Sequence, residues 1–191
     1  AIRNMNRHMG TALREVGAAV LDFVKDSVNA YAELEQNIGG SEAVFGEYAQ
    51  AVQGYAADAY KTMATTQSDY LATANKMGAL FQGSGLTAQR SMELTTMAMQ
   101  RAADMASVMG IDTQSALDAV TGAAKGNYTM MDNLGVAMNA TTIEAYALSK
   151  GINQSFNEMD NATKVALAME MFLEKTAYAE GKINQAQYVE G

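Results

Sequence analysis

The sequence contains no proline and no cysteine. Average usage would place about ten prolines in a chain of this length, so their absence favours long uninterrupted helices and argues against rigid proline-rich linkers. Without cysteine, disulfides, thiolate metal ligands and a cysteine nucleophile are excluded. The two absences together favour a helical protein that has no covalent or thiolate cross-links.

Histidine is almost absent, because His8 is the only one, and it falls inside an expected helix. We interpret it as an exposed or helix-packing side chain. A zinc site of the HExxH type needs a second histidine, and a Ser-His-Asp triad would have to recruit His8 without a nucleophile elbow. Gly83-x-Gly85 lacks the Lys-Ser/Thr pair of a phosphate-binding loop, as does the stretch 122–126.

Paired carboxylates are the remaining candidates for chemistry. They lie at Glu33/Glu35, Glu42/Glu47, Glu158/Asp160 and Glu170/Glu174. A two-carboxylate hydrolase stays an alternative, since distances in the folded chain are not visible in the sequence. Solvated helix faces and helix caps account for all of these residues. We therefore expect that the protein is not an enzyme, and we predict no catalytic, cofactor-binding or metal-binding residue and no cofactor.

The formal net charge is −8 at pH 7, and it is unevenly distributed. Residues 1–20 carry three arginines against one glutamate, a balance of +2, whereas residues 21–60 carry one lysine against seven acidic residues, a balance of −6. A nucleic-acid-binding protein needs a concentrated cationic face, so no nucleic-acid partner is expected. No uncharged apolar run approaches the roughly 20 residues that span a bilayer.

Residues 2–36 carry an apolar stripe at helical spacing. Its mean step is close to the period of about 3.6 residues, so the stripe stays on one side of a straight helix and does not wind as a heptad coiled coil would. The stripe consists of Met9, Leu13, Val16, Val20, Val24, Ser27, Tyr31, Leu34 and Ile38. Such a helix either packs on the rest of its own chain or associates with copies of itself, and we favour self-association through residues 9–34.

The clearest predicted break is the segment 37–41, because Gly39 and Gly40 are helix terminators and Ser41 is a good cap for a following helix. We therefore predict a long amphipathic helix over residues 1–40, a helical bundle over 41–181 and a trailing segment of a longer chain over 182–191. Inside the bundle, a second helix is expected over 42–64. A third is expected from the capping-box pattern Thr66-Gln-Ser-Asp69.

The stretch 87–109 is predicted to be the central helix, with Thr87 as its N-cap. Apolar side chains fill about half of its circumference, and an arc that wide suits a helix packed against several neighbours. The arc contains Met92, Leu94, Ala98, Met99, Ala102, Ala103, Met105, Ala106 and Met109. The polar side is expected to contain Gln89, Arg90, Glu93, Gln100, Arg101, Asp104 and Ser107.

Several shorter elements follow the central helix. The segment 110–113 predicts a stop and a new cap, after which we expect a helix to about residue 124 and short helical turns that begin at Thr129 and Thr141. A final helix is expected over about 160–180, with Val165, Ala168, Met169, Phe172 and Leu173 facing inward. The predicted fold class is therefore all-α: a long N-terminal amphipathic helix followed by a compact multi-helix bundle.

A resemblance to a known family lies in three stretches of the sequence. They are KMGALFQGSGLTAQRSMELTTMAMQRAADMASVMGID (76–112), GAAKGNYTMMDNLGVAMNATTIEAYALSKGI (122–152) and FVKDSVNAYAELEQNIGG (23–40). The first two resemble the conserved helical region of phage tail tape-measure proteins, and the third is similar to the helix that leads into that region. The likeness covers roughly residues 20–180 and rests on a long ordered string of residues, not on a short catalytic signature.

The resemblance implies a structural module of a phage, prophage or phage-tail-like particle. Such a protein is made in the bacterial host cytoplasm, occupies the lumen of the tail tube and sets the length of the tail. The implied partners are further copies of the chain, tail tube and tail tip proteins, tail assembly chaperones and the host membrane on ejection. The alternative hypothesis is a secreted helical effector or a membrane-active pore-forming module, whose helices would rearrange in a bilayer.

Overall fold

The computed structural model describes the backbone of residues 2–183 and the side-chain surroundings of residues 18–183. The described residues form helices and no strand, which confirms the predicted all-α class. The elements are α1 (Ile2–Phe45), η1 (Gly46–Tyr48), α2 (Ala49–Met63), α3 (Gln67–Gly83), α4 (Ala88–Met109), α5 (Thr113–Ala124), η2 (Thr129–Leu134), α6 (Ala140–Ser149), α7 (Asn161–Lys175) and η3 (Ala177–Ala179), where η marks a short 3₁₀ helix.

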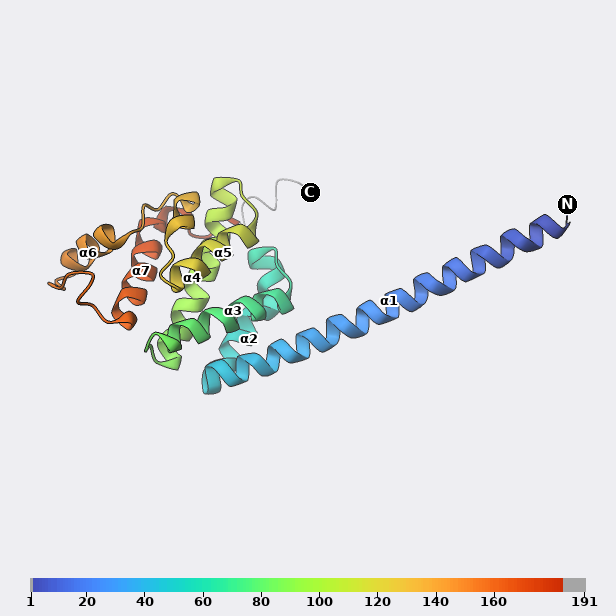
Figure 1. Ribbon diagram of the computed structural model, residues 1–191, viewed down its shortest axis with the longest axis horizontal. Coiled ribbons are helices and arrows are strands. Elements are labelled where there is room, and N and C mark those ends of the chain that lie inside the picture. The colour runs from blue at the N-terminus through green and yellow to red at the C-terminus, as the bar shows by residue number, and fades with distance from the viewer. Residues whose placement is uncertain (1, 184–191) are drawn as a thin grey trace. The chain divides into compact units, whose positions relative to one another are not determined.

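The chain divides into two compact units, residues 1–36 and residues 37–191, and each is described by itself. The first consists of the N-terminal part of α1. The second begins with the last turns of α1 and contains all the other helices (Figure 1).

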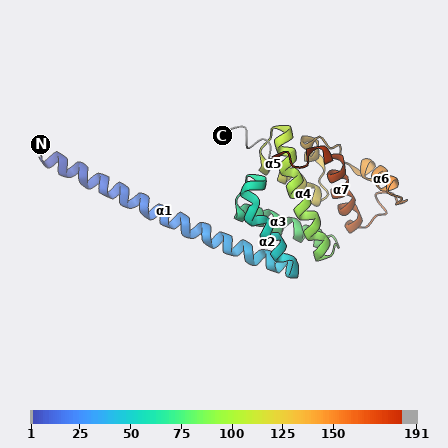
Figure 2. The ribbon, with the colours of Figure 1, turned by 180° about the vertical axis from the view of Figure 1, so that it is seen from behind.

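Helix α4 is the centre of the second unit, as predicted. It contacts α2, α3, α5 and α7, and it runs between α3 and α7 in both views (Figures 1 and 2). The Thr87 hydroxyl caps it by accepting the Arg90 N–H at 3.2 Å, and Gly110 ends it at φ +68°. Of the predicted apolar arc, Met92 and Met109 are partly exposed, and the fully buried members are Leu94, Ala98, Met99, Ala102, Ala103, Met105 and Ala106.

The predicted helix break at 37–41 is wrong, because α1 continues unbroken to Phe45. Gly40 is not a terminator but a site of close approach: a Cβ there would lie 2.7 Å from Nδ2 of Asn75. Ser41 does not cap a new helix, since its hydroxyl donates within α1 to the Ile38 carbonyl at 2.6 Å. The chain turns instead at Gly46, whose φ of +55° is a left-handed conformation that glycine adopts without a steric penalty.

The last turn of α1 packs closely on α3. A Cβ built on Gly78 would lie 2.3 Å from the ring of Phe45, so the two helices approach at a distance that only glycine allows there. The amide of Gln82 donates to the Val44 carbonyl at 2.6 Å, and the amide of Asn75 donates to the Asn37 carbonyl at 2.9 Å. These contacts hold residues 37–45 against α3 within the second unit.

The starts of α3, α6 and the helices between and after them follow local capping chemistry. Thr66 caps α3 as predicted, and its hydroxyl accepts the Asp69 N–H at 3.1 Å. The Asp69 carboxylate accepts from the Thr66 hydroxyl at 2.6 Å, and not from the backbone N–H of Thr66 as in a full capping box. The predicted start of α6 at Thr141 is two residues late, because Asn139 is the cap. The final helix α7 ends at Lys175 rather than near residue 180, and η3 follows it.

Candidate functional site

Four of the eight paired carboxylates have structural partners. Asp160 caps α7 by accepting the Thr163 N–H at 2.7 Å, and this bond lowers the pKa of Asp160. Glu158 accepts the backbone N–H of Ser155 at 3.0 Å, which lowers its pKa in the same way. Asp160 therefore serves as a helix cap, and Glu158 stabilises the turn that begins at Ser155.

The pair Glu170/Glu174 lies on α7 and bonds to two neighbouring helices. Glu170 forms an ion pair with Arg90 of α4. Glu174 accepts from the Lys150 ammonium at 2.6 Å and from the Tyr146 hydroxyl at 2.9 Å, and these two bonds, Lys150 first, lower the pKa of Glu174. The other four paired carboxylates, Glu33, Glu35, Glu42 and Glu47, are exposed.

Residues 18–183 contain no group of three or more histidine or acidic side chains placed to hold a metal ion. His8 lies outside the residues whose side chains are described. Among the described helices, none is both long enough and apolar enough to cross a bilayer.

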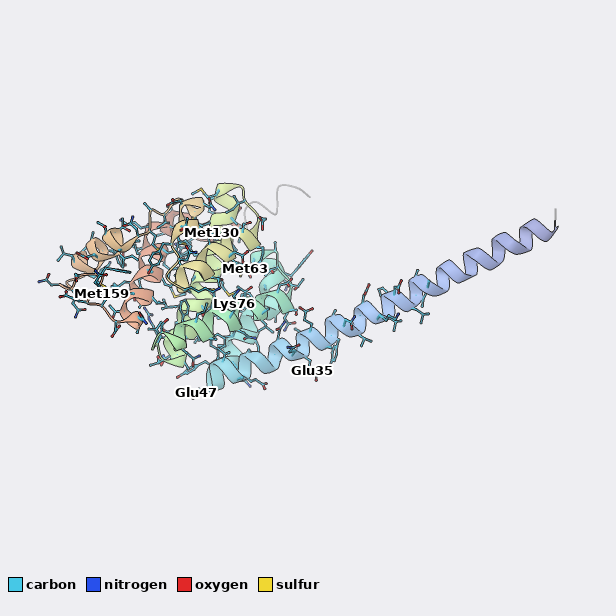
Figure 3. All side chains as sticks on the ribbon, viewed as in Figure 1. Glu35, Glu47, Met63, Lys76, Met130 and Met159 are labelled. Carbon is cyan, nitrogen blue, oxygen red and sulfur yellow. The ribbon has the colours of Figure 1, made fainter. Side chains whose placement is uncertain are left out.

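The first notable surface is the apolar stripe of α1. Its members Val24 and Tyr31 are exposed by 50% and 69%, and Phe23 and Val28, which flank the stripe on the same helix, are exposed by 72% and 62%. In Figure 3 these turns of α1 carry side chains that project from the ribbon. Unpartnered apolar side chains at this density along one helix mark an interaction surface. We call the stripe over residues 20–34, together with Phe23 and Val28, the α1 seam.

The α1 seam continues in spacing into a part of α1 that is packed. The steps of three and four residues that link Tyr31, Leu34 and Ile38 lead on to Ser41 and Phe45, both of which are fully buried in the second unit. The same helical stripe is thus an established packing surface at its C-terminal end. The predicted seam members Met9, Leu13 and Val16 lie outside the residues whose side chains are described.

The second notable feature is a buried pair of charges on α4. Arg101 and Asp104, predicted on the polar side of the helix, are only 8% and 1% exposed, so that prediction is wrong for both. The Arg101 guanidinium donates to the Leu173 carbonyl at 2.8 Å and to the Glu180 carboxylate at 2.9 Å. Asp104 accepts the backbone N–H groups of Gly181 at 3.0 Å and Ile183 at 3.2 Å.

This charged pair fixes the C-terminal segment 173–183 on the central helix. Buried charges of this kind need an opposite charge or hydrogen bonds, and here Arg101 is paired with Glu180 while Asp104 accepts two backbone N–H groups. The only signal in the sequence was an Arg-x-x-Asp spacing within an alanine- and methionine-rich helix. That signal did not reveal the partners, because they lie more than 70 residues further along the chain.

Beside the charged pair lies a pocket of about 230 Å³, which we call the α4 pocket. It is lined by residues of α2, α3 and α4, together with Leu173 and Glu180. Its rim includes the exposed side chains of Tyr55 and Met97, and its interior includes Met63 and Tyr70. Burial, and to a smaller extent the nearby Tyr55, raise the pKa of Tyr70, so its phenol is neutral at physiological pH.

No family model, curated protein or solved structure matches the chain. Two features of the described residues are candidate binding sites, the α1 seam and the α4 pocket. In both, the exposure of the side chains or the identity of their partners depends on tertiary structure.

Proposed function

We propose that the chain is a structural module of a phage tail tape-measure protein, which occupies the tail-tube lumen, sets tail length and acts by helix packing and self-association. The observation that carries the proposal is the exposed α1 seam. It is supported by the sequence resemblance over roughly residues 20–180, and by a helix α1 of 44 residues. The partners in this proposal are other copies through residues 9–34, together with tail tube and tail tip proteins and tail assembly chaperones.

The length of α1 suits a ruler. A helix rises about 1.5 Å per residue, so 44 residues correspond to roughly 66 Å of continuous rod. In a rod of this kind, length is proportional to the number of residues. Insertion of whole turns changes the length without moving the apolar side chains to another face.

Self-association is energetically reasonable for this helix. Full burial of a valine or phenylalanine side chain contributes about 1.5–3 kcal/mol, and the seam offers at least four such side chains per copy. Association costs several kcal/mol in lost translational and rotational freedom. The free energy gained when two or more copies bury their seams against each other is sufficient to offset that cost.

The charge of the opposite face favours association with protein over association with lipid. In the described part of α1 that face carries Asp22, Asp26 and Glu33 against Lys25, all exposed. Amphipathic helices that bind anionic lipid surfaces carry lysine and arginine on this face. The effector or pore-forming alternative therefore has less support from α1 than self-association has.

Light scattering on the purified chain tests the self-association step. We expect an oligomer at high concentration for the natural sequence and a monomer for Val24→Asp, because the new charge would have to be buried in the seam. Asn29→Asp places the same charge on the polar face and should leave the oligomer intact. A natural chain that stays monomeric at all concentrations, or equal dissociation by both variants, would contradict the proposal.

Tail length in a phage that carries this chain tests the ruler function itself. Duplication of residues 16–33 inserts 18 residues, which is five turns, and keeps the seam in phase. We expect electron microscopy to show tails longer by about 27 Å. Tails of unchanged length would rule out a ruler role. Unchanged tails together with leakage of lipid vesicles on addition of the purified chain would support the membrane-active alternative.

A further inference from the structure

The α4 pocket has a surplus of hydrogen-bond acceptors. Thr62 and Thr96 donate their hydroxyl hydrogens to carbonyls of their own helices, at 3.1 and 3.0 Å. The Gln100 amide donates to the Thr62 carbonyl at 3.1 Å, and within residues 18–183 its side-chain oxygen has no donor. The two threonine hydroxyls and the Gln100 side chain therefore present mainly oxygen lone pairs to the pocket.

The formal charge in the pocket is negative. Arg101 contributes +1, and Asp104 and Glu180 contribute −1 each, so the three lining groups sum to −1. The guanidinium is paired with Glu180 and a backbone carbonyl, and Asp104 is occupied by two backbone N–H groups. The Glu180 side chain is 77% exposed, so its carboxylate keeps acceptor positions open at the rim.

Aromatic and sulfur-containing side chains complete the site. Tyr55 is 56% exposed at the rim, Met97 is 53% exposed beside it, and Tyr70 is 2% exposed inside. The Tyr70 hydroxyl has no hydrogen-bond partner within the described part of the chain, although the ring is buried. Tyrosine rings attract cations through their negative faces, and methionine packs along alkyl chains.

We propose that the α4 pocket binds a primary alkylammonium group, either the side chain of a lysine or a free diamine. An ammonium supplies three N–H donors for the surplus acceptors, a positive charge for the net charge of −1 and an alkyl arm for Met97. An anionic ligand would meet lining groups of net charge −1 that present more acceptors than donors. This inference is independent of the proposed tape-measure role, since the pocket shares no residue with the α1 seam.

Methyl NMR of the intact chain labelled with ¹³C-methyl methionine tests the proposal directly. We expect saturable shifts of the Met63 and Met97 methyl signals on titration with butylammonium, none at Met159, which does not line the pocket (Figure 3), and weakening of the effect by added salt. Butanol, the neutral analogue, should produce no saturable shift. Comparison of 1,4-diaminobutane with N-acetyl-lysine amide then separates a free diamine from a lysine side chain as the source.

Two variants with matched controls complete the test. Tyr55→Leu should weaken butylammonium binding about two- to five-fold through loss of the cation–π contact, and Glu180→Gln by a similar factor through loss of charge. Tyr60→Leu, at an exposed tyrosine of α2 outside the pocket, and Glu42→Gln should leave binding unchanged. The proposal is overturned if the Met63 and Met97 signals do not shift, if butanol acts like butylammonium, or if the controls weaken binding as much as the pocket variants.

Discussion

Residues 18–36 of α1 and the helix α4 are both amphipathic, yet their apolar stripes have opposite environments. In α4, Leu94, Met99 and Met105 are no more than 1% exposed, whereas in α1 Phe23 and Val28 are more than half exposed. The stripe of α4 is wider, and helices from the same chain cover it on several sides. An apolar stripe on a helix therefore indicates a face that will be buried, and the width of the stripe indicates how many neighbours the helix has. It does not indicate whether those neighbours belong to the same chain.

The largest effect is expected from placing a charge in each of the two stripes. Ala102→Asp buries an unpaired carboxylate at a site of 0% exposure and should lower the free energy of unfolding by about 3 kcal/mol or more. Val24→Asp lies on an exposed stripe and should change the unfolding of an isolated chain by less than about 0.5 kcal/mol. Urea denaturation at low protein concentration measures both. Equal losses would mean that the two stripes do not differ as described.

A smaller effect is expected at the buried charge of α4. Asp104→Ala leaves the N–H groups of Gly181 and Ile183 without their acceptor and should cost about 2–3 kcal/mol. Asp118→Ala, on the exposed face of α5, is the matched control and should stay within about 0.5 kcal/mol of the natural chain. If thermal and urea unfolding of the two variants coincide, Asp104 does not fix the C-terminal segment.

The smallest effects, of opposite sign, are expected at two glycines in helices. Gly78→Ala forces a Cβ against the Phe45 ring and should destabilise the chain by about 1–3 kcal/mol. Gly54→Ala meets nothing within 4 Å in the interior of α2 and should stabilise the chain by about 0.5–1 kcal/mol. Melting temperatures that move in opposite directions would support the packing of α1 on α3. A stabilised Gly78→Ala variant would contradict it.

Helix starts were well predicted where one side chain bonds to the backbone three residues further on. Thr66, Thr87 and Asp112 each accept the N–H of the residue at that spacing, so the signal and its partner lie in the same short stretch of sequence. The predicted α4 arc was largely correct for a similar reason, because the helical period alone determines which side chains share a face. These features depend on interactions within one or two turns.

The errors arose where the partner lies far along the chain. Gly39 and Gly40 predict a break, but both lie inside the continuous helix α1. Gly40 lies close to Asn75 of α3, and the chain turns at Gly46. The candidate pocket had no sequence signal, because Tyr55, Tyr70 and Met97 come from three different helices. No periodic pattern relates such positions to one another.

The sequence by itself determined that the chain is all-α, where most of its helices begin and most of the apolar arc of α4, because short-range hydrogen bonds and the helical period are encoded within a few residues. Only the tertiary structure decided that Arg101 and Asp104 are buried, and that Phe45 is enclosed while Phe23 is exposed. Burial is set by what packs against a side chain. The partners that compensate for the burial of Arg101 are 72 to 79 residues away, and at that separation the sequence contains no local signal.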